Sequence, residues 1–157
     1  MSNNNGFTLI EVLIAMVVLA LGLLGLAGLQ ATSLKQNQSA NFRSQATLLA
    51  YDLADKMRAN LSQSAAYIAA LPNGTANANC IPNPPSTTGC TAAQMAANDV
   101  AVWQTSVKTL LPSGVGSMAL NNNGTATIVD DIFTITINWD DNRSGAGDTQ
   151  FQVSFHL

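Results

Sequence analysis

Glu11 is the residue whose position most strongly indicates a chemical task. It stands near the start of an apolar segment that continues without another charge to Leu29. A carboxylate inside an apolar helix is costly in lipid, about 2.5 kcal/mol or more, unless it meets an opposite charge. Such a pairing depends on register, so Glu11 could fix the axial position of one helix against another. The alternative is that Glu11 lies at the level of the lipid headgroups, which its position near the helix start allows.

The two cysteines form a second candidate site. Cys80 and Cys90 bracket a stretch rich in proline, asparagine and threonine, which is typical of a loop. We predict a disulfide between them, because a membrane segment suggests export to an oxidising compartment. A metal site is the weaker interpretation, since two thiols at this spacing lack further ligands and the only histidine, His156, is far along the chain.

An acidic turn offers hard oxygen ligands. Its ligand candidates are Asp140, Asp141, Asn142 and Asp148. Oxygen atoms of this kind can bind calcium. However, the spacing does not match the helix-loop-helix calcium signature, and Asp, Asn and Gly are also common turn formers. No metal ligands are therefore assigned, and calcium binding is kept only as an alternative.

No arrangement of residues indicates catalysis. The single histidine, His156, is the penultimate residue, and we expect it to face solvent on the last strand. No glycine-rich phosphate loop is present, because Gly22 and Gly25 lie inside the apolar segment. The sequence therefore predicts no catalytic residue, no cofactor and no enzyme activity.

Composition excludes further classes. The chain has 157 residues, of which 10% are charged, against about 25% in typical soluble proteins. The net charge is −3, and the six basic residues are scattered. Phosphate binding needs a clustered basic face, so a nucleic-acid partner is not expected. The length suits one ordinary domain together with one membrane segment.

The first thirty residues predict a retained membrane helix. Residues 12–29, extended by Phe7 to Ile10, are long enough to span a bilayer. A secretory signal peptide is disfavoured, because the segment lacks a basic start and a small-x-small cleavage site at its end. Gly22, Gly25 and Gly28 indicate a packing seam, a stretch that can unwind, or ordinary membrane-helix composition.

Helical periodicity continues beyond the membrane segment, and we predict one long helix to about residue 68. Its apolar face is expected to consist of Phe42, Ala46, Leu49, Leu53, Met57, Leu61 and Ile68. Pro72-Asn73-Gly74 marks its end. The apolar positions are too irregular for a coiled coil.

A second helix is predicted to begin at the capping box formed by Thr91 and Gln94 and to stop at Pro112-Ser113-Gly114. Its predicted apolar face consists of Met95, Val102, Trp103, Val107, Leu110 and Leu111. Trp103 is expected to be a core anchor rather than a ligand-stacking side chain.

The last part of the chain has the period of two that is typical of half-buried strands. Apolar residues alternate with polar ones in Ile135–Trp139 and in Phe151–Phe155. A turn at Asn121–Gly124 is predicted to join strands at 117–120 and 125–129. The predicted fold class is α+β, with a long helix covering one face of an antiparallel sheet and a second helix beside it.

Residues 6–11, Gly6-Phe7-Thr8-Leu9-Ile10-Glu11, resemble the processing motif of type IV pilins and of the pseudopilins of type II secretion. The resemblance implies that prepilin peptidase cleaves between Gly6 and Phe7 and methylates the new amino group of Phe7. It also implies that Glu11 neutralises a Phe7 ammonium group, on its own chain or on a neighbouring subunit. The implied organisation is a leader at 1–6, a transmembrane half-helix at 7–29, an amphipathic half-helix at 30–71 and a globular head at 72–157.

Two positions depart from the family pattern. The leader contains no Lys or Arg, so the usual charge bias for membrane orientation is weak. Gly28 occupies a position where major pilins commonly have a proline, and we hypothesise that this glycine weakens the helix in the same way.

The head is similar to that of minor pilins of the PilV kind. The similarity is carried by residues 99–103, 110–112 and 135–141, and by the position of the cysteines before the second helix. It implies a structural subunit that primes or caps a type IV pilus. The implied partners are other minor pilins, the major pilin, a tip adhesin, prepilin peptidase and the inner-membrane assembly platform, with a separate ATPase supplying the energy.

The alternative functions are a minor pseudopilin of type II secretion and, less favoured, a pilin whose head binds a ligand or DNA. A membrane-anchored enzyme is disfavoured by the lack of a catalytic arrangement. The implied location is the bacterial inner membrane, crossed once with the head in the periplasm, and then the extracellular pilus.

Overall fold

A computed structural model describes residues 8–80, 89–121, 131–142 and 147–157. The chain forms two compact units, residues 1–40 and residues 41–157. The helices and strands follow the order α1 (Leu9–Ala59), η1 (Leu61–Gln63), α2 (Ser64–Ala69), η2 (Ala78–Cys80), α3 (Ala92–Leu110), β1 (Val115–Asn121), β2 (Ile132–Trp139) and β3 (Thr149–His156).

The first unit consists, in its described part, of the beginning of helix α1. Each residue from 8 to 38 is exposed, including large apolar side chains such as Leu9, which is 80% exposed, and Leu24, which is 70% exposed. Leucine, alanine and methionine are good helix formers, and no proline interrupts them. The helix therefore forms although none of these side chains is buried.

Helix α1 ends at Ala59, earlier than the predicted end near residue 68. At Asn60 the backbone leaves the helical region, with φ −126° and ψ 47°, and the short helices η1 and α2 follow. The side-chain amide of Asn60 donates a hydrogen bond to the carbonyl oxygen of Ala92 at 2.8 Å. This contact between distant parts of the chain stabilises the break. Leu61, expected on the buried face, is instead 50% exposed.

Helix α3 begins and ends as predicted, but its buried face agrees with the predicted one only in part: Trp103 and Val107 are buried, as is Leu111 just after the helix, whereas other predicted residues are not. The buried residues are Ala96, Asn98, Val100, Trp103 and Val107. Met95, Val102 and Leu110 were expected in the core and are exposed. The prediction overlooked Ala96 and Val100, which share one face of the helix with Trp103 and Val107 at helical spacing.

The sheet has the order β1-β2-β3, and both strand pairs are antiparallel. Ile135 of β2 lies opposite Met118 of β1 and Val153 of β3, so apolar side chains form rows on one face. The predicted alternation is confirmed, because every second residue of β2 from Phe133 to Trp139 is buried. The predicted strand at 125–129 lies outside the described residues.

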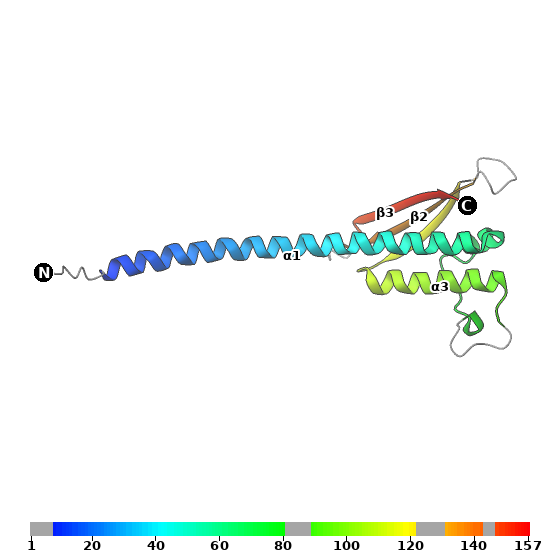
Figure 1. Ribbon diagram of the computed structural model, residues 1–157, viewed down its shortest axis with the longest axis horizontal. Helices are drawn as coiled ribbons and strands as arrows, with labels where there is room; N and C mark the ends of the chain where they lie inside the picture. Colours follow the sequence, from blue (N-terminus) through cyan, green and yellow to red (C-terminus); the bar gives the residue numbers. More distant parts are fainter. Residues whose placement is uncertain (1–7, 81–88, 122–130, 143–146) are drawn as a thin grey trace. The chain divides into compact units, whose positions relative to one another are not determined.

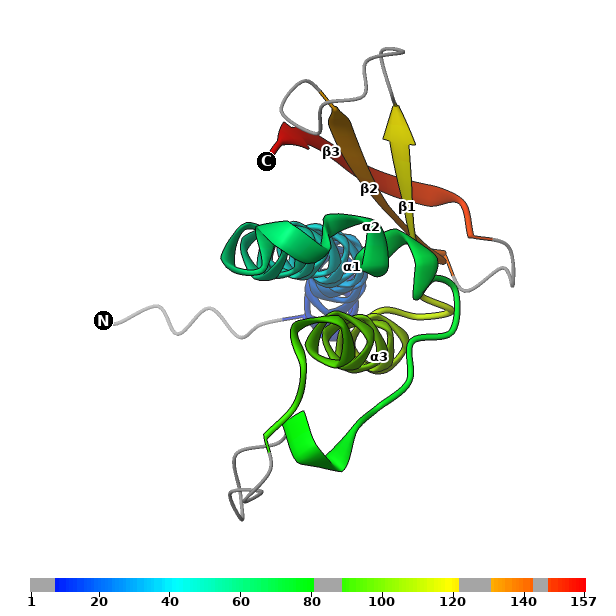
Figure 2. The same ribbon diagram turned by 90° about the vertical axis from the view of Figure 1, so that its right-hand side faces the viewer.

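In the second unit, the last part of α1 lies between the sheet and α3 (Figures 1 and 2). Ala46, Leu49, Leu53 and Met57 of α1 are buried in this core, as the periodicity predicted. Trp103 of α3 is fully buried, and its indole N–H donates a hydrogen bond to the carbonyl oxygen of Leu49 at 2.8 Å. The expected role of Trp103 as a core anchor is confirmed.

Close packing also explains one glycine in the sheet. A side chain at Gly116 of β1 would clash with the indole ring of Trp103. The ring therefore lies directly against the backbone of β1, which joins α3 to the sheet. Long helix, second helix and antiparallel sheet together confirm the predicted α+β class.

Candidate functional site

Glu11 lies in the first turn of α1. The turn is closed by hydrogen bonds from the backbone N–H groups of Glu11 and Val12 to the carbonyl oxygen of Thr8, at 3.1 and 3.4 Å. A negative charge is favoured here, because the first turn of a helix has unpaired N–H groups and a positive dipole end. Glu11 is exposed and forms no ion pair within the described residues. Gly6 and Phe7 lie outside the described residues.

The helix that presents Glu11 is suited to a membrane. By length and composition, α1 is the one helix in the described part of the chain that could cross a bilayer, with a mean hydropathy of 2.8 over 18 residues. Those 18 residues span about 27 Å, close to the thickness of a hydrocarbon core. None of that window is buried within the protein. Its apolar surface is therefore available to lipid or to other helices.

The three glycines of this segment do not disturb the helix. Gly22, Gly25 and Gly28 all lie within continuous α1. No atom lies within 4 Å of the position that a side chain would take at any of them. The described residues thus provide no partner for the predicted packing seam, and the helix is not unwound in this structure.

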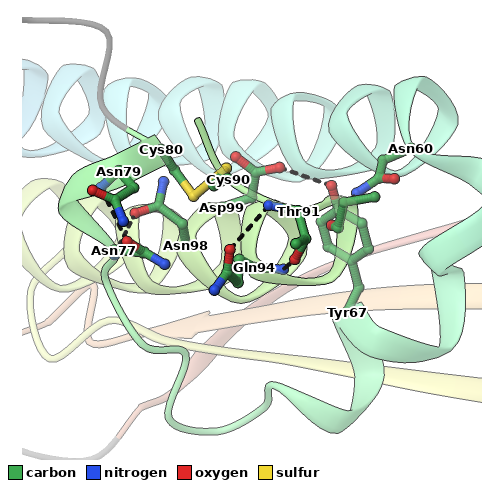
Figure 3. Close-up of a disulfide and its surroundings, with 11 residues drawn as sticks. Asn60, Tyr67, Asn77, Asn79, Cys80, Cys90, Thr91, Gln94, Asn98 and Asp99 are labelled. Carbon is green, nitrogen blue, oxygen red and sulfur yellow. Dashed lines mark hydrogen bonds between the residues drawn. A yellow bond between two sulfur atoms is a disulfide. The ribbon is translucent and has the colours of Figure 1, made fainter. Parts of the chain in front are cut away.

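The cysteine loop joins two elements of the head. Cys80 at the end of η2 forms a disulfide with Cys90, with 5.2 Å between the Cα atoms (Figure 3). Thr91 follows immediately and caps α3. Its hydroxyl accepts a hydrogen bond from the Gln94 N–H at 3.2 Å, and its own N–H donates to the Gln94 side chain at 2.9 Å. The disulfide is therefore attached directly to the start of α3.

A polar network beside this disulfide escaped prediction. The hydroxyl of Tyr67 in α2 donates to the carboxylate of Asp99 in α3 at 2.7 Å (Figure 3). It also lies 3.1 Å from the carbonyl oxygen of Lys56. Burial, followed by the hydrogen bond with Asp99, raises the pKa of Tyr67, so its hydroxyl stays protonated. The backbone N–H of Asn77 donates to the Asn98 side chain at 2.9 Å. The network links the end of α1, α2 and α3.

Sequence reasoning missed these residues because their partners are 11 to 32 positions away. The only signal in the sequence was the tyrosine among the mostly small residues of 64–69, because such a large side chain on a short helix is expected to pack into the core. Lys56, Asn60, Asp99 and Met95 also line a cleft of about 480 Å³ between the end of α1 and the start of α3. Lys56 is paired with Asp52 at 2.9 Å. The lining offers no nucleophile paired with a base.

The acidic turn is held by its own hydrogen bonds. Asp148 accepts hydrogen bonds from the backbone N–H of Asp141 at 3.0 Å and from the side-chain amide of Asn142. These two donors, in that order, lower the pKa of Asp148. The backbone N–H of Asp140 donates to the carbonyl oxygen of Pro112 at 2.9 Å. Asp148 therefore serves as a hydrogen-bond acceptor within the described part of the turn.

The remaining described side chains that could bind a metal or take part in catalysis are dispersed. Among residues 8–80, 89–121, 131–142 and 147–157, no three His, Cys, Asp or Glu side chains are grouped to hold a metal ion. His156 is exposed at the end of β3, as predicted. Among the described residues, Glu11 is the candidate whose position most strongly indicates a function.

Two family models match the chain. Residues 28–101 match a model described as type IV pilin Tt1218, and residues 1–27 match the prokaryotic N-terminal methylation motif. The second match contains Gly6, Phe7 and Glu11. No curated protein and no solved structure gives a significant match to the chain.

The two matches together run from residue 1 to residue 101, and they support the assignment of the chain to the type IV pilin superfamily. The observed α+β fold, with its long apolar N-terminal helix, is consistent with a pilin. The matches support a general role as a pilin or pseudopilin, and the methylation motif with the apolar N-terminal helix suggests an anchor in a membrane. Neither match distinguishes a minor pilin of the PilV kind from other members.

Proposed function

We propose that the protein is a minor pilin, a structural and non-enzymatic subunit that helps to prime or cap a type IV pilus together with other minor pilins. The observation that carries this proposal is Glu11 in the first turn of an exposed apolar helix that continues into a folded head. A membrane anchor alone has no need of that carboxylate, which is costly in lipid when unpaired.

The distribution of positive charge supports a terminal partner for Glu11. The first 34 residues contain no Lys, Arg or His. Lys35 is 24 positions further along α1, which is about 36 Å at the helical rise. Within the membrane, the only cation that one copy can offer near Glu11 is its own terminal amino group. A neighbouring copy offers the same group.

Cleavage by prepilin peptidase between Gly6 and Phe7 would create that amino group four positions before Glu11. The match of residues 1–27 to the methylation motif supports this site and the methylation of Phe7. A methylated secondary amine remains protonated at neutral pH, so the ion pair with Glu11 is preserved. In this proposal Phe7 and Glu11 together set the axial position of a subunit in the filament.

The proposed partners follow from this assembly role. They are prepilin peptidase, the inner-membrane assembly platform, other minor pilins, the major pilin and a tip adhesin. The proposed location is the inner membrane, crossed once by α1 with the head in the periplasm, followed by the extracellular pilus. The low and scattered positive charge supports no nucleic-acid partner.

The test is complementation of a deletion strain with Glu11→Ala and Glu11→Gln. Gln30→Ala, an exposed and uncharged position on the same helix, serves as the matched control. We expect both Glu11 variants to accumulate in the membrane, with their leader removed, but to support few surface pili. Gln30→Ala should restore piliation.

Normal piliation by the Glu11→Ala strain would contradict the assembly role. Normal piliation in the deletion strain with a loss of protein secretion would favour the pseudopilin alternative instead. Immunoblots of the membrane fraction separate a failure of assembly from a loss of the protein.

A further inference from the structure

The three strands that the structure describes, β1, β2 and β3, carry no Asp, Glu, Lys or Arg side chain. Charge lies on the helices and in the residues that flank the strands, such as Asp131, Asp140 and Asp148. Proteins usually protect the outer strands of a sheet with charged residues, prolines or bulges, because unpaired backbone groups there attract other chains. In the described part of the sheet, β1 and β3 are the outer strands, and each has an unbroken register with β2 and contains no proline.

The core is also incomplete at both outer strands. On the central strand, Ile135 and Ile137 are fully buried. The residues of the same face on the outer strands, Met118 of β1 and Phe151 and Val153 of β3, are only half-buried. Within the described residues, neither outer strand has a second strand beside it. A further strand at either edge would cover these apolar side chains.

The directions of the strands limit which pairing is suitable. β1 and β3 run in the same direction, because each is antiparallel to β2 (Figure 2). Two copies that point the same way can therefore place β3 of one copy beside β1 of the next, in parallel orientation. Pairing of β3 with β3 of a second copy in one sheet would reverse one of the two heads. Copies anchored in one membrane point the same way, which favours the parallel arrangement.

Charges at the two edges are complementary in this arrangement. Asp148 directly precedes β3, and Lys108 lies in the last turn of α3, shortly before β1. Both are exposed, and Lys108 forms no ion pair within the described residues. Parallel pairing aligns the beginning of β3 with the beginning of β1, so Asp148 of one copy approaches Lys108 of the other. Such a pair favours the correct partner and orientation.

We propose that β3 of one copy pairs with β1 of a second copy, so that the sheets of neighbouring heads join edge to edge. Backbone hydrogen bonds would supply the attraction, and the half-buried rows of Met118 and Val153 would supply the match of side chains. The contact is of the head-to-tail kind, which leaves β1 of the first copy free for another subunit. It requires only copies that lie side by side, whether or not the protein is a minor pilin.

The test is cysteine cross-linking of two differently tagged full-length copies in membranes. One copy carries Ser117→Cys or Ala119→Cys on β1, and the other carries Gln150→Cys or Gln152→Cys on β3. Ser117, Ala119, Gln150 and Gln152 are uncharged and lie on the face of the sheet opposite the core. We expect a disulfide-linked dimer between a β1 cysteine and a β3 cysteine, strongest for one combination of positions.

Val102→Cys in both copies is the control for random collision, because Val102 is exposed on α3, outside the sheet. Lys108→Glu should reduce the cross-link between β1 and β3, because it places like charges together. Ala119→Lys combined with Ser117→Cys, or Gln152→Lys combined with Gln150→Cys, should reduce the cross-link more strongly by placing a charge on an edge strand. Immunoblots for both tags confirm that each variant is present in the membrane.

Three outcomes would overturn the proposal. The first is cross-linking of the β1 and β3 cysteines no stronger than that of the Val102→Cys pair. The second is a dominant dimer between two β3 cysteines, which would indicate the reversed arrangement. The third is an unchanged cross-link after Lys108→Glu together with Gln152→Lys or Ala119→Lys.

Discussion

The two parts of helix α1 have the same helical backbone conformation but differ in the burial of their side chains. From residue 9 to residue 38 each side chain is exposed, and most are apolar. From residue 41 to residue 59 the apolar side chains Ala46, Leu49, Leu53 and Met57 are buried, whereas Asp52 and Asp55 face solvent. One part thus presents apolar surface on all sides, and the other presents a single apolar stripe.

This difference shows that the two parts are stabilised by different environments. A helix that is apolar all round needs lipid or other helices, whereas an amphipathic helix needs one packed face. The head can therefore be perturbed through its core without affecting the anchor. The anchor can be perturbed through Glu11 without affecting the stability of the head.

The largest expected effect comes from Trp103→Ala. The change removes a fully buried side chain and its hydrogen bond to Leu49, so the head should lose about 3–5 kcal/mol of unfolding free energy. Leu24→Ala in the exposed part of α1 is the control and should leave the unfolding of the head within about 0.5 kcal/mol of the original. Urea unfolding of the full chain in detergent measures both. It is monitored by far-UV circular dichroism, because the Trp103→Ala change would alter a tryptophan fluorescence signal. Equal losses would contradict the separation of head and anchor.

Loss of the disulfide should have the next largest effect. In Cys80→Ser/Cys90→Ser, the chain between η2 and α3 is no longer closed into a loop, and we expect a loss of about 2–4 kcal/mol. Reduction of the original protein by dithiothreitol should produce a similar loss, and the double variant should not respond to it. A stability that is insensitive to both changes would show that the capping box at Thr91 is sufficient to hold α3.

Glycine-to-alanine changes should have opposite effects in the two regions. Gly116→Ala places a methyl group against the indole of Trp103 and should destabilise the head by about 1–3 kcal/mol. Gly25→Ala has free space and should favour the helix by up to about 1 kcal/mol. Thermal unfolding reports the first, and the helical signal of the detergent-solubilised chain reports the second. A tolerated Gly116→Ala would contradict the close packing of α3 on β1.

The smallest expected effect is a loosening of the acidic turn at low pH. The pKa of Asp148 is lowered from an ordinary value of 3.8, first by the Asp141 N–H and then by Asn142. A lowered pKa means that the folded turn favours the ionised carboxylate, so its contribution is complete above pH 3.8 and is lost as the pH falls through the lowered pKa. The protection factor of the Asp141 amide against hydrogen exchange should fall over that range. In Asp148→Asn, this pH dependence should be absent.

Local patterns predicted most of the fold correctly. The alternation in Ile135–Trp139 and the capping box at Thr91 each depend on residues close in sequence, and both are confirmed. The buried stripe from Ala46 to Met57 was also visible, because helical spacing alone places these residues on one face. Where a helix or strand is stabilised by its own neighbours in sequence, its type could be inferred.

Contacts between distant residues explain what the sequence did not reveal. The end of α1 depends on Asn60 meeting Ala92, which lies 32 positions further along the chain. No local pattern contains that information. For the candidate site, Glu11 was recognisable as a charge in an apolar segment, whereas the network of Tyr67 and Asp99 required the folded head.

We infer that cleavage between Gly6 and Phe7 creates the positive charge that Glu11 requires. The most direct measurement is mass spectrometry of the mature chain isolated from membranes, which gives its mass and its N-terminal sequence. We expect a chain that begins at Phe7, with one methyl group on its terminal nitrogen. A mature chain that begins at Met1 would contradict it, because Glu11 would then have no terminal cation four positions away.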